Sequence, residues 1–152
     1  AYHNLGTILQ QLGDIKKAMV CYEKAIQINP NYASAHNNLG NAFNELGEHK
    51  KAVGCCEKAI QINLNNASAH NNLGNAFKKL KKHKKAIACY EKAIQTNPKY
   101  VLANYNLGKI FRELGKRSEA IKCFQKSNLT SSRAELLECI YFSDNLNNYE
   151  KI

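Results

Sequence analysis

One segment of eleven residues occurs twice in this chain, and the two copies lie 34 residues apart. ASAHNNLGNAF runs from Ala33 to Phe43 and again from Ala67 to Phe77. The same step of 34 aligns Leu-Gly pairs at residues 5–6, 39–40, 73–74 and 107–108. Self-similarity at a period of this size indicates that a small structural unit is copied along the chain and stacked on its neighbours. The sequence therefore predicts a repeat array instead of a single globular core.

Each unit carries the apolar pattern of two helices joined by a turn. In the third unit, Ala69, Leu73 and Phe77 fall on one helical face, and a second apolar stripe follows after a basic turn. Glycine closes the first helix of three units, at Gly13, Gly47 and Gly115. Lys81 holds the same position in the third unit, where we expect it to strain the turn.

The repeat length and the helix–turn–helix pattern resemble the tetratricopeptide repeat (TPR) family. The resemblance implies an all-α fold, a right-handed α-solenoid of TPR hairpins. We expect four repeats in residues 1–132, with boundaries at 1–32, 33–66, 67–100 and 101–132. Residues 133–152 are expected to form either a capping helix or a truncated, degenerate fifth repeat.

The C-terminal segment carries two further signals. Ser132 and Glu135 have the spacing of a capping box at a helix start. Residues 149–152 resemble the beginning of another second helix, which favours the degenerate fifth repeat. The chain begins with Ala1 instead of methionine, so we expect it to be part of a longer polypeptide.

One asparagine precedes the Leu-Gly pair of each repeat, and together these residues form an asparagine ladder. The ladder consists of Asn4, Asn38, Asn72 and Asn106. Asparagine is a mediocre helix former, so four in register call for a reason, and an amide group can pair with a peptide backbone of any sequence. The ladder and the NNLGNAF segments are similar to the TPR superhelix of O-linked N-acetylglucosamine transferases. The TPR resemblance implies that the ladder faces a concave groove, whereas the simpler interpretation is local bonding within each helix.

The same resemblance places further groove residues near the ladder. They are Asn37, Asn41, Asn44, Asn71, Asn75, Lys78, Lys79, Tyr105, Lys109 and Arg112. The groove should change from neutral amides to basic side chains toward the C-terminal repeats. The carboxylate clamp of chaperone-binding TPR proteins is matched at three of its five positions, by Asn41, Asn72 and Lys109.

Positive charge is concentrated in the third repeat. The whole chain has a net charge of +10, and residues 67–100 hold eight lysines against one glutamate, a net +7. Such a cluster is either a solvated face or a surface for phosphate or for an acidic protein. Nucleic-acid binding would also need accessible aromatic rings, and most Tyr and Phe fall in packing positions. We therefore do not expect a nucleic-acid partner.

No residue set predicts catalysis, a cofactor or a metal site. Four of the six cysteines share one repeat position, and the spacing of stacked helices is too wide for disulfides between them. Four of the five histidines recur at packing positions, where hydrogen bonding is the simpler interpretation and a metal between repeats the alternative. Reduced thiols suit a cytoplasmic location, and no segment has the length of apolar sequence that spans a membrane.

The sequence thus predicts a non-enzymatic scaffold that binds a protein or peptide, either an extended or an acidic segment. Two alternatives remain open. One is the substrate-recognition array of a larger enzyme such as a glycosyltransferase. The other is a structural array that self-associates through its terminal repeats.

Overall fold

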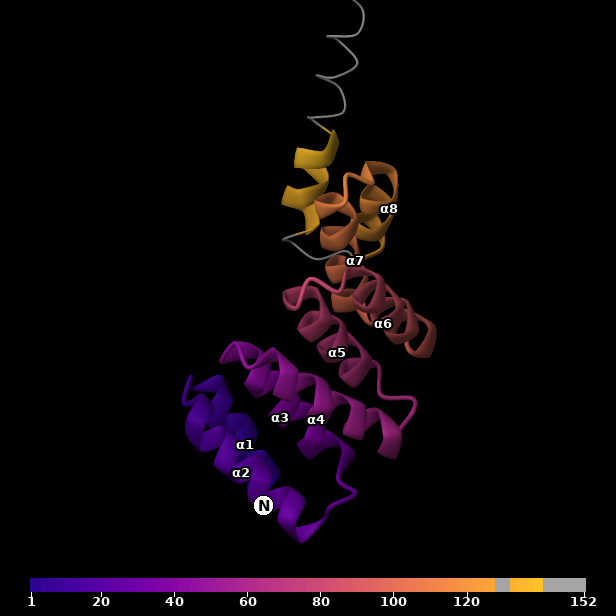
Figure 1. The fold of residues 1–152 in the computed structure, drawn as a ribbon. Coiled ribbons are helices and arrows are strands. Elements are labelled where there is room, and N and C mark those ends of the chain that lie inside the picture. The colour runs from indigo at the N-terminus through magenta and orange to yellow at the C-terminus, as the bar shows by residue number, and fades with distance from the viewer. Residues whose placement is uncertain (128–131, 141–152) are drawn as a thin grey trace, which may run out of the picture. The chain divides into compact units, whose positions relative to one another are not determined.

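The computed structural model describes residues 1–127 and 132–140, and their regular structure is helical (Figure 1). The predicted all-α fold is thereby confirmed. The chain divides into two compact units, residues 1–96 and residues 97–152. Within the described part, no helix has the length and apolar character needed to cross a membrane.

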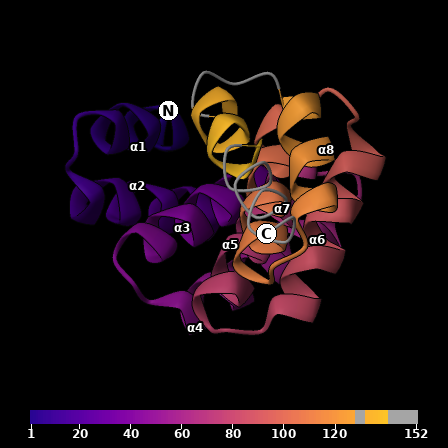
Figure 2. The ribbon, with the colours of Figure 1, turned by 90° about the horizontal axis from the view of Figure 1, so that it is seen from above.

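Unit 1 consists of three helical hairpins. The first hairpin pairs α1 (Tyr2–Gln11) with α2 (Ile15–Ile28), the second α3 (Ala33–Glu45) with α4 (His49–Ile62), and the third α5 (Ala67–Lys79) with α6 (His83–Thr96). Each predicted repeat of this unit contains one such pair. Figures 1 and 2 show the two helices of each hairpin lying side by side, with the next hairpin stacked on them.

Close contact within a hairpin depends on a glycine in the first helix. A Cβ atom added to Gly74 would lie 2.6 Å from Cε1 of Tyr90, a distance that real Cβ contacts do not reach. Tyr90 is 0% exposed and donates a 2.8 Å hydrogen bond from its hydroxyl to Oδ1 of Asn75. The missing side chain at Gly74 therefore makes the space that the aromatic ring of α6 fills.

The turns between paired helices use a left-handed residue, as the glycine pattern predicts. Gly13 and Gly47 have φ angles of +84° and +79°. Lys81 takes the equivalent place in the third hairpin with φ of +60°, a conformation that is costly for a residue with a Cβ atom. Lys81 thus adopts the left-handed conformation from which the strain was predicted, and the strain itself stays a prediction.

Replacing Lys81 by glycine is therefore expected to raise the free energy of unfolding by about 0.5–1 kcal/mol, because glycine adopts positive φ without steric cost. Urea denaturation followed by circular dichroism would measure the change. Lys79→Gly, at the last residue of α5, is the matched control and should instead destabilise, by up to about 1 kcal/mol. A destabilised Lys81→Gly variant would contradict the strain.

The first helix of unit 1 leaves an apolar face exposed. Leu5 and Ile8 are 47% and 54% exposed, whereas Leu39 and Leu73, which match Leu5 in the next two repeats, are both 7% exposed. The difference arises because a preceding hairpin covers the later positions. Self-association through terminal repeats remains a prediction that would use this face.

Unit 2 consists of α7 (Val101–Glu113), α8 (Arg117–Ser127) and a further helix at residues 132–140. Phe124 of α8 and Cys139 of helix 132–140 share a buried cluster, against which Leu136 packs. Helix 132–140 thus covers this hairpin, as a capping helix or the first helix of a fifth repeat would. The predicted second helix at 149–152 lies outside the described residues.

Two residues of the predicted capping box make other contacts in unit 2. The Ser132 hydroxyl pairs with the hydroxyl of Ser127, and both serines are buried. The Glu135 carboxylate accepts hydrogen bonds from Arg112 and Tyr105. These side chains therefore join helix 132–140 to α8 and α7.

Candidate functional site

A polar hollow lies on the first helices of unit 1, between the first and second hairpins. Its volume is about 340 Å³. It is lined by Thr7, Gln10, Gln11, Tyr22, Asn38, Asn41 and Glu45. Two predicted site residues, Asn38 and Asn41, therefore share one concave surface with residues of α1.

Hydrogen bonds between the lining side chains hold this hollow in shape. Nε2 of Gln10 and Nδ2 of Asn41 both donate to Oε1 of Glu45, at 2.6 and 2.8 Å. The Tyr22 hydroxyl donates to Oε1 of Gln10 at 2.8 Å. The carboxylate of Glu45 is thus the common acceptor that ties α1 to α3.

Glu45 was not among the residues predicted from the sequence. It lies four residues after Asn41, which places the two side chains on the same side of the helix. That spacing was the available signal. The Glu45 carboxylate adds hydrogen-bond acceptors to the polar hollow, which suits a ligand with N–H donors.

The asparagine ladder joins successive first helices. Nδ2 of Asn38 donates to Nε2 of His3 at 3.0 Å, and Nδ2 of Asn72 donates to Oδ1 of Asn37 at 3.0 Å. In both cases the partner lies 35 residues earlier, on the preceding first helix. Asn72 is only 7% exposed, whereas Asn4 is exposed and Asn38 is half-buried. Sequence reasoning considered a ligand or the same helix as the partner and missed the neighbouring helix.

The other predicted residues of unit 1 lie on α5. Asn75 is half-buried and accepts from the Tyr90 hydroxyl. Lys78 is half-buried and Lys79 is exposed in the last turn of the helix. Within unit 1, the first-helix residues thus change from amides and a carboxylate on α1 and α3 to amide and lysine on α5.

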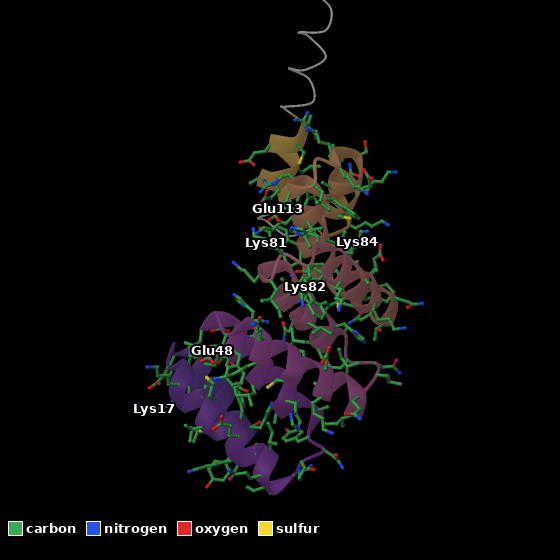
Figure 3. The ribbon with its side chains drawn as sticks, in the orientation of Figure 1. Lys17, Glu48, Lys81, Lys82, Lys84 and Glu113 are labelled. Atoms are coloured by element: carbon green, nitrogen blue, oxygen red, sulfur yellow. The ribbon has the colours of Figure 1, made fainter. Side chains whose placement is uncertain are left out.

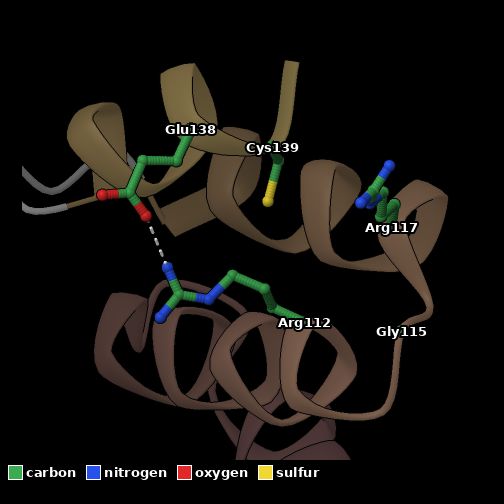
Figure 4. Close-up of a pocket in the computed structure, with 5 residues that line it drawn as sticks. All are labelled: Arg112, Gly115, Arg117, Glu138 and Cys139. Carbon is green, nitrogen blue, oxygen red and sulfur yellow. Dashed lines mark hydrogen bonds and ion pairs between the residues drawn. The ribbon is translucent and has the colours of Figure 1, made fainter. Parts of the chain in front are cut away.

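The remaining predicted residues belong to unit 2. The ammonium of Lys109 lies 5.4 Å from the centre of the Tyr105 ring. Arg112 contacts the carboxylates of both Glu135 and Glu138, the latter at 2.9 Å (Figure 4). Asn106 is half-buried in α7. The charge predicted to select an acidic ligand at Arg112 is thus already paired with helix 132–140.

A hollow of about 380 Å³ lies beside this ion pair, and Figure 4 shows its lining. The lining consists of Arg112 from α7, Gly115 from the turn, Arg117 from α8, and Glu138 and Cys139 from helix 132–140. Burial raises the pKa of the Cys139 thiol. This keeps the thiol protonated near neutral pH and therefore a poor nucleophile.

The six cysteines are free thiols in the structure. Burial raises the pKa of Cys55 to about 11 and that of Cys56 to about 12, and the pKa of Cys89 also rises to about 11. A thiol that stays protonated at physiological pH reacts slowly. These residues pack the helices, as expected for buried cysteine.

Two histidines close the loops between hairpins. Nε2 of His36 bonds to the Pro30 carbonyl at 2.9 Å, and Nε2 of His70 bonds to the Leu64 carbonyl at 3.0 Å. Among the described residues, no three His, Cys, Asp or Glu side chains are grouped so that they could hold a metal ion. The hydrogen-bonding interpretation of these histidines is therefore supported by direct contacts.

Comparison with known proteins places these features in a family. A family model described as "TPR repeat" matches residues 6–47 and 40–81, and models described as "Tetratricopeptide repeat" match residues 67–100 and 89–122. None of the curated proteins compared with the chain matches it.

Solved structures of TPR proteins are similar to this chain over most of its length. PilF of Pseudomonas aeruginosa is 28% identical with a TM-score of 0.86, over 95% of this chain and 68% of PilF. TTC0263 of Thermus thermophilus, a TPR protein, is 20% identical with a TM-score of 0.84, over 96% and 83%. The first TPR domain of Spaghetti (RPAP3), solved with the HSP90 peptide SRMEEVD, is 24% identical with a TM-score of 0.71, over 75% and 90%. By its repeats, its helical hairpins and the family models that match it, this chain belongs to the tetratricopeptide repeat family.

Proposed function

We propose that this chain is a peptide-binding TPR module and that the polar hollow on α1 and α3 binds the backbone of an extended segment. The observation that carries the proposal is the hollow itself, because its volume of about 340 Å³ combines amide, hydroxyl and carboxylate groups from two hairpins. Each amide offers two donors and an acceptor, so the lining can pair with backbone N–H and C=O groups.

The hydrogen bonds within the hollow support a preformed site. Because Glu45 already orients Gln10 and Asn41, little side-chain entropy remains to be lost when a ligand binds. The ordering of an extended ligand still costs free energy, so the dissociation constant is expected to be roughly micromolar.

The other predicted residues extend this proposal along the first helices. Asn4 and Asn75 would continue the contacts in unit 1, and Lys78 and Lys79 would select acidic side chains. In unit 2, the amide of Asn106 would contact the ligand backbone, and Lys109 and Arg112 would bind acidic side chains. Arg112 would first have to exchange Glu135 and Glu138 for ligand carboxylates. Asn72 is 7% exposed and bonded to Asn37, so it would support the packing of α5 on α3 more than contact the ligand.

The fold is compatible with this function, because the RPAP3 domain of the same fold holds a peptide. The narrower resemblance to O-linked N-acetylglucosamine transferases rests on the asparagine ladder and remains a prediction. The same holds for the proposals that the chain serves a larger enzyme or assembles with itself.

A peptide array followed by titration tests the proposal. The full chain is applied to an array of peptides without Asp or Glu, and the best peptide is titrated by fluorescence anisotropy. Asn38→Ala together with Asn41→Ala should weaken binding about tenfold, because two hydrogen bonds to the ligand are lost.

The matched control changes two exposed asparagines of the interhairpin loops, Asn31→Ala with Asn65→Ala. It should leave the affinity within about twofold of the original. If both double variants bind equally well, or if no neutral peptide binds, the polar hollow is not the peptide site.

A further inference from the structure

Four lysines at the end of α5 and in the turn that follows stand where the first two hairpins have other residues. Lys81 stands where they have a glycine, Lys82 where they have an acid, and Lys78 and Lys79 where the second has Asn44 and Glu45. Figure 3 labels Lys17 at the start of α2 and Glu48 just before α4, and Lys81, Lys82 and Lys84 at the corresponding place of the third hairpin. We define Lys81, Lys82, Lys84 and Lys85 as the turn patch.

The acidic position carries a carboxylate that pairs with a nearby lysine in the first two hairpins. Asp14 accepts from the backbone N–H of Lys17 at 3.3 Å and pairs with its ammonium at 2.8 Å. Glu48 pairs with the ammonium of Lys51 at 2.5 Å. A carboxylate at this place thus neutralises the lysine three residues later. Lys82 occupies the place in the third hairpin, so the local counter-charge is replaced by a second positive charge.

Lys85 is the lysine that a carboxylate at position 82 would pair with, and it lies as its equivalent Lys51 does. The ammonium of Lys85 lies 5.4 Å from the centre of the Phe77 ring, and that of Lys51 lies 5.4 Å from the centre of the Phe43 ring. The third hairpin therefore presents the same ammonium on the same kind of ring. What differs is the carboxylate beside it.

Lys81 and Lys78 also stand in place of residues that stabilise the earlier hairpins. Lys81 adopts φ of +60° in place of glycine. In the second hairpin, Oδ1 of Asn44 bonds to Nδ1 of His49 at 3.3 Å, whereas Nδ1 of the equivalent His83 is buried and has no hydrogen-bond partner among the described residues. Three local stabilising features are thus absent from one turn, and local inconsistencies of this kind gather at functional sites.

We propose that the turn patch is a docking surface for an acidic segment of another protein, a short run of Asp and Glu residues. This surface is separate from the polar hollow on α1 and α3, so the inference does not rest on the proposed peptide site. All four lysines of the patch are exposed. Partner carboxylates would take the place beside Lys85 that Asp14 and Glu48 hold in the other hairpins.

The side chains around the patch favour an acidic protein over a nucleic acid. Single-stranded nucleic acids gain much of their affinity from bases stacked on accessible aromatic rings. Here Phe77 is 8% exposed and lies under Lys85, and Tyr90 is 0% exposed. The patch therefore offers ammonium groups without a stacking platform, and lysine–carboxylate pairs are the contacts that the same turn makes in the other hairpins.

Anisotropy titration with a fluorescein-labelled peptide containing consecutive glutamates tests the proposal on the full chain. Lys82→Asp with Lys84→Glu should weaken binding about tenfold at low salt, because two attractive contacts become repulsive. The melting temperature of this variant should not fall, because the introduced aspartate would restore the cap and the pairing that Asp14 provides in the first hairpin. Lys82→Gln with Lys84→Gln, which adds no repulsion, should weaken binding about threefold.

The matched control is Lys58→Asp with Lys92→Glu, which changes the net charge by the same amount as the patch variant. Both lysines are exposed on second helices and donate to Gln61 and Gln95. The control should stay within about twofold of the original affinity. Equal weakening by control and patch variants would overturn the proposal, since only net charge would then matter. Tighter, patch-dependent binding of an oligothymidine or of anionic vesicles would overturn the assignment to an acidic protein.

Discussion

Replacing Tyr90 by alanine is expected to lower the free energy of unfolding of unit 1 by about 3–5 kcal/mol. The ring is 0% exposed and fills the space left by Gly74, whose Cβ position would lie 2.6 Å from Cε1. Its hydroxyl donates to Asn75 at 2.8 Å, so the change removes both packing and a hydrogen bond. Urea denaturation of the full chain, followed by circular dichroism, measures the loss.

Two variants separate the contributions and control for the residue type. Tyr90→Phe keeps the ring and should cost only about 1 kcal/mol, the value of one hydrogen bond. Tyr2→Ala removes an aromatic ring that is 40% exposed and should cost less than about 1 kcal/mol. A Tyr90→Ala variant no less stable than Tyr2→Ala would show that the close contact with Gly74 does not stabilise the hairpin.

Replacing Arg112 by alanine is expected to loosen helix 132–140 from α7. Arg112 contacts Glu135 and Glu138, and the Glu135 side chain is only 16% exposed. Without Arg112 this mostly covered carboxylate keeps only the Tyr105 hydroxyl as a donor among the contacts described above. We expect about 2 kcal/mol of lost stability at this contact, equivalent to roughly 30-fold faster amide exchange in the helix. Hydrogen exchange with mass spectrometry measures it.

The control for this prediction is Arg133→Ala, which removes an exposed arginine from helix 132–140 itself and should leave exchange nearly unchanged. Glu135→Gln combined with Arg112→Ala completes a double-mutant cycle. The two effects should be less than additive, because each change removes the same ion pair. Strict additivity would mean that the pair does not hold the helix.

The helical hairpins could be predicted because their determinants are local. The apolar spacing of Ala69, Leu73 and Phe77, and the copies of that pattern every 34 residues, depend on the period of the helix and not on the surroundings. The left-handed conformation of Lys81 was also predictable, because the earlier turns show glycine at that position. Each of these inferences needs only residues within one repeat or a comparison between repeats.

The candidate site was only partly predictable. Asn38 and Asn41 do line the polar hollow, but Glu45, which holds it together, was missed. Asn72 shares the repeat position of Asn38 and yet is buried against Asn37. Arg112 matches a groove position by spacing, and its charge is paired with Glu135 and Glu138. The same repeat position thus has different surroundings in different repeats.

By itself the amino-acid sequence determined the repeat, its pairs of helices, the left-handed turn positions and the concentration of positive charge in the third repeat. These follow from backbone geometry and from side-chain spacing along one helix. The tertiary structure alone decided which polar groups a ligand can reach. Asn72 donates to a residue of the preceding first helix, and Glu45 joins α3 to α1. Contacts of this kind depend on how closely neighbouring helices stack, and spacing within a single helix carries no information on that distance.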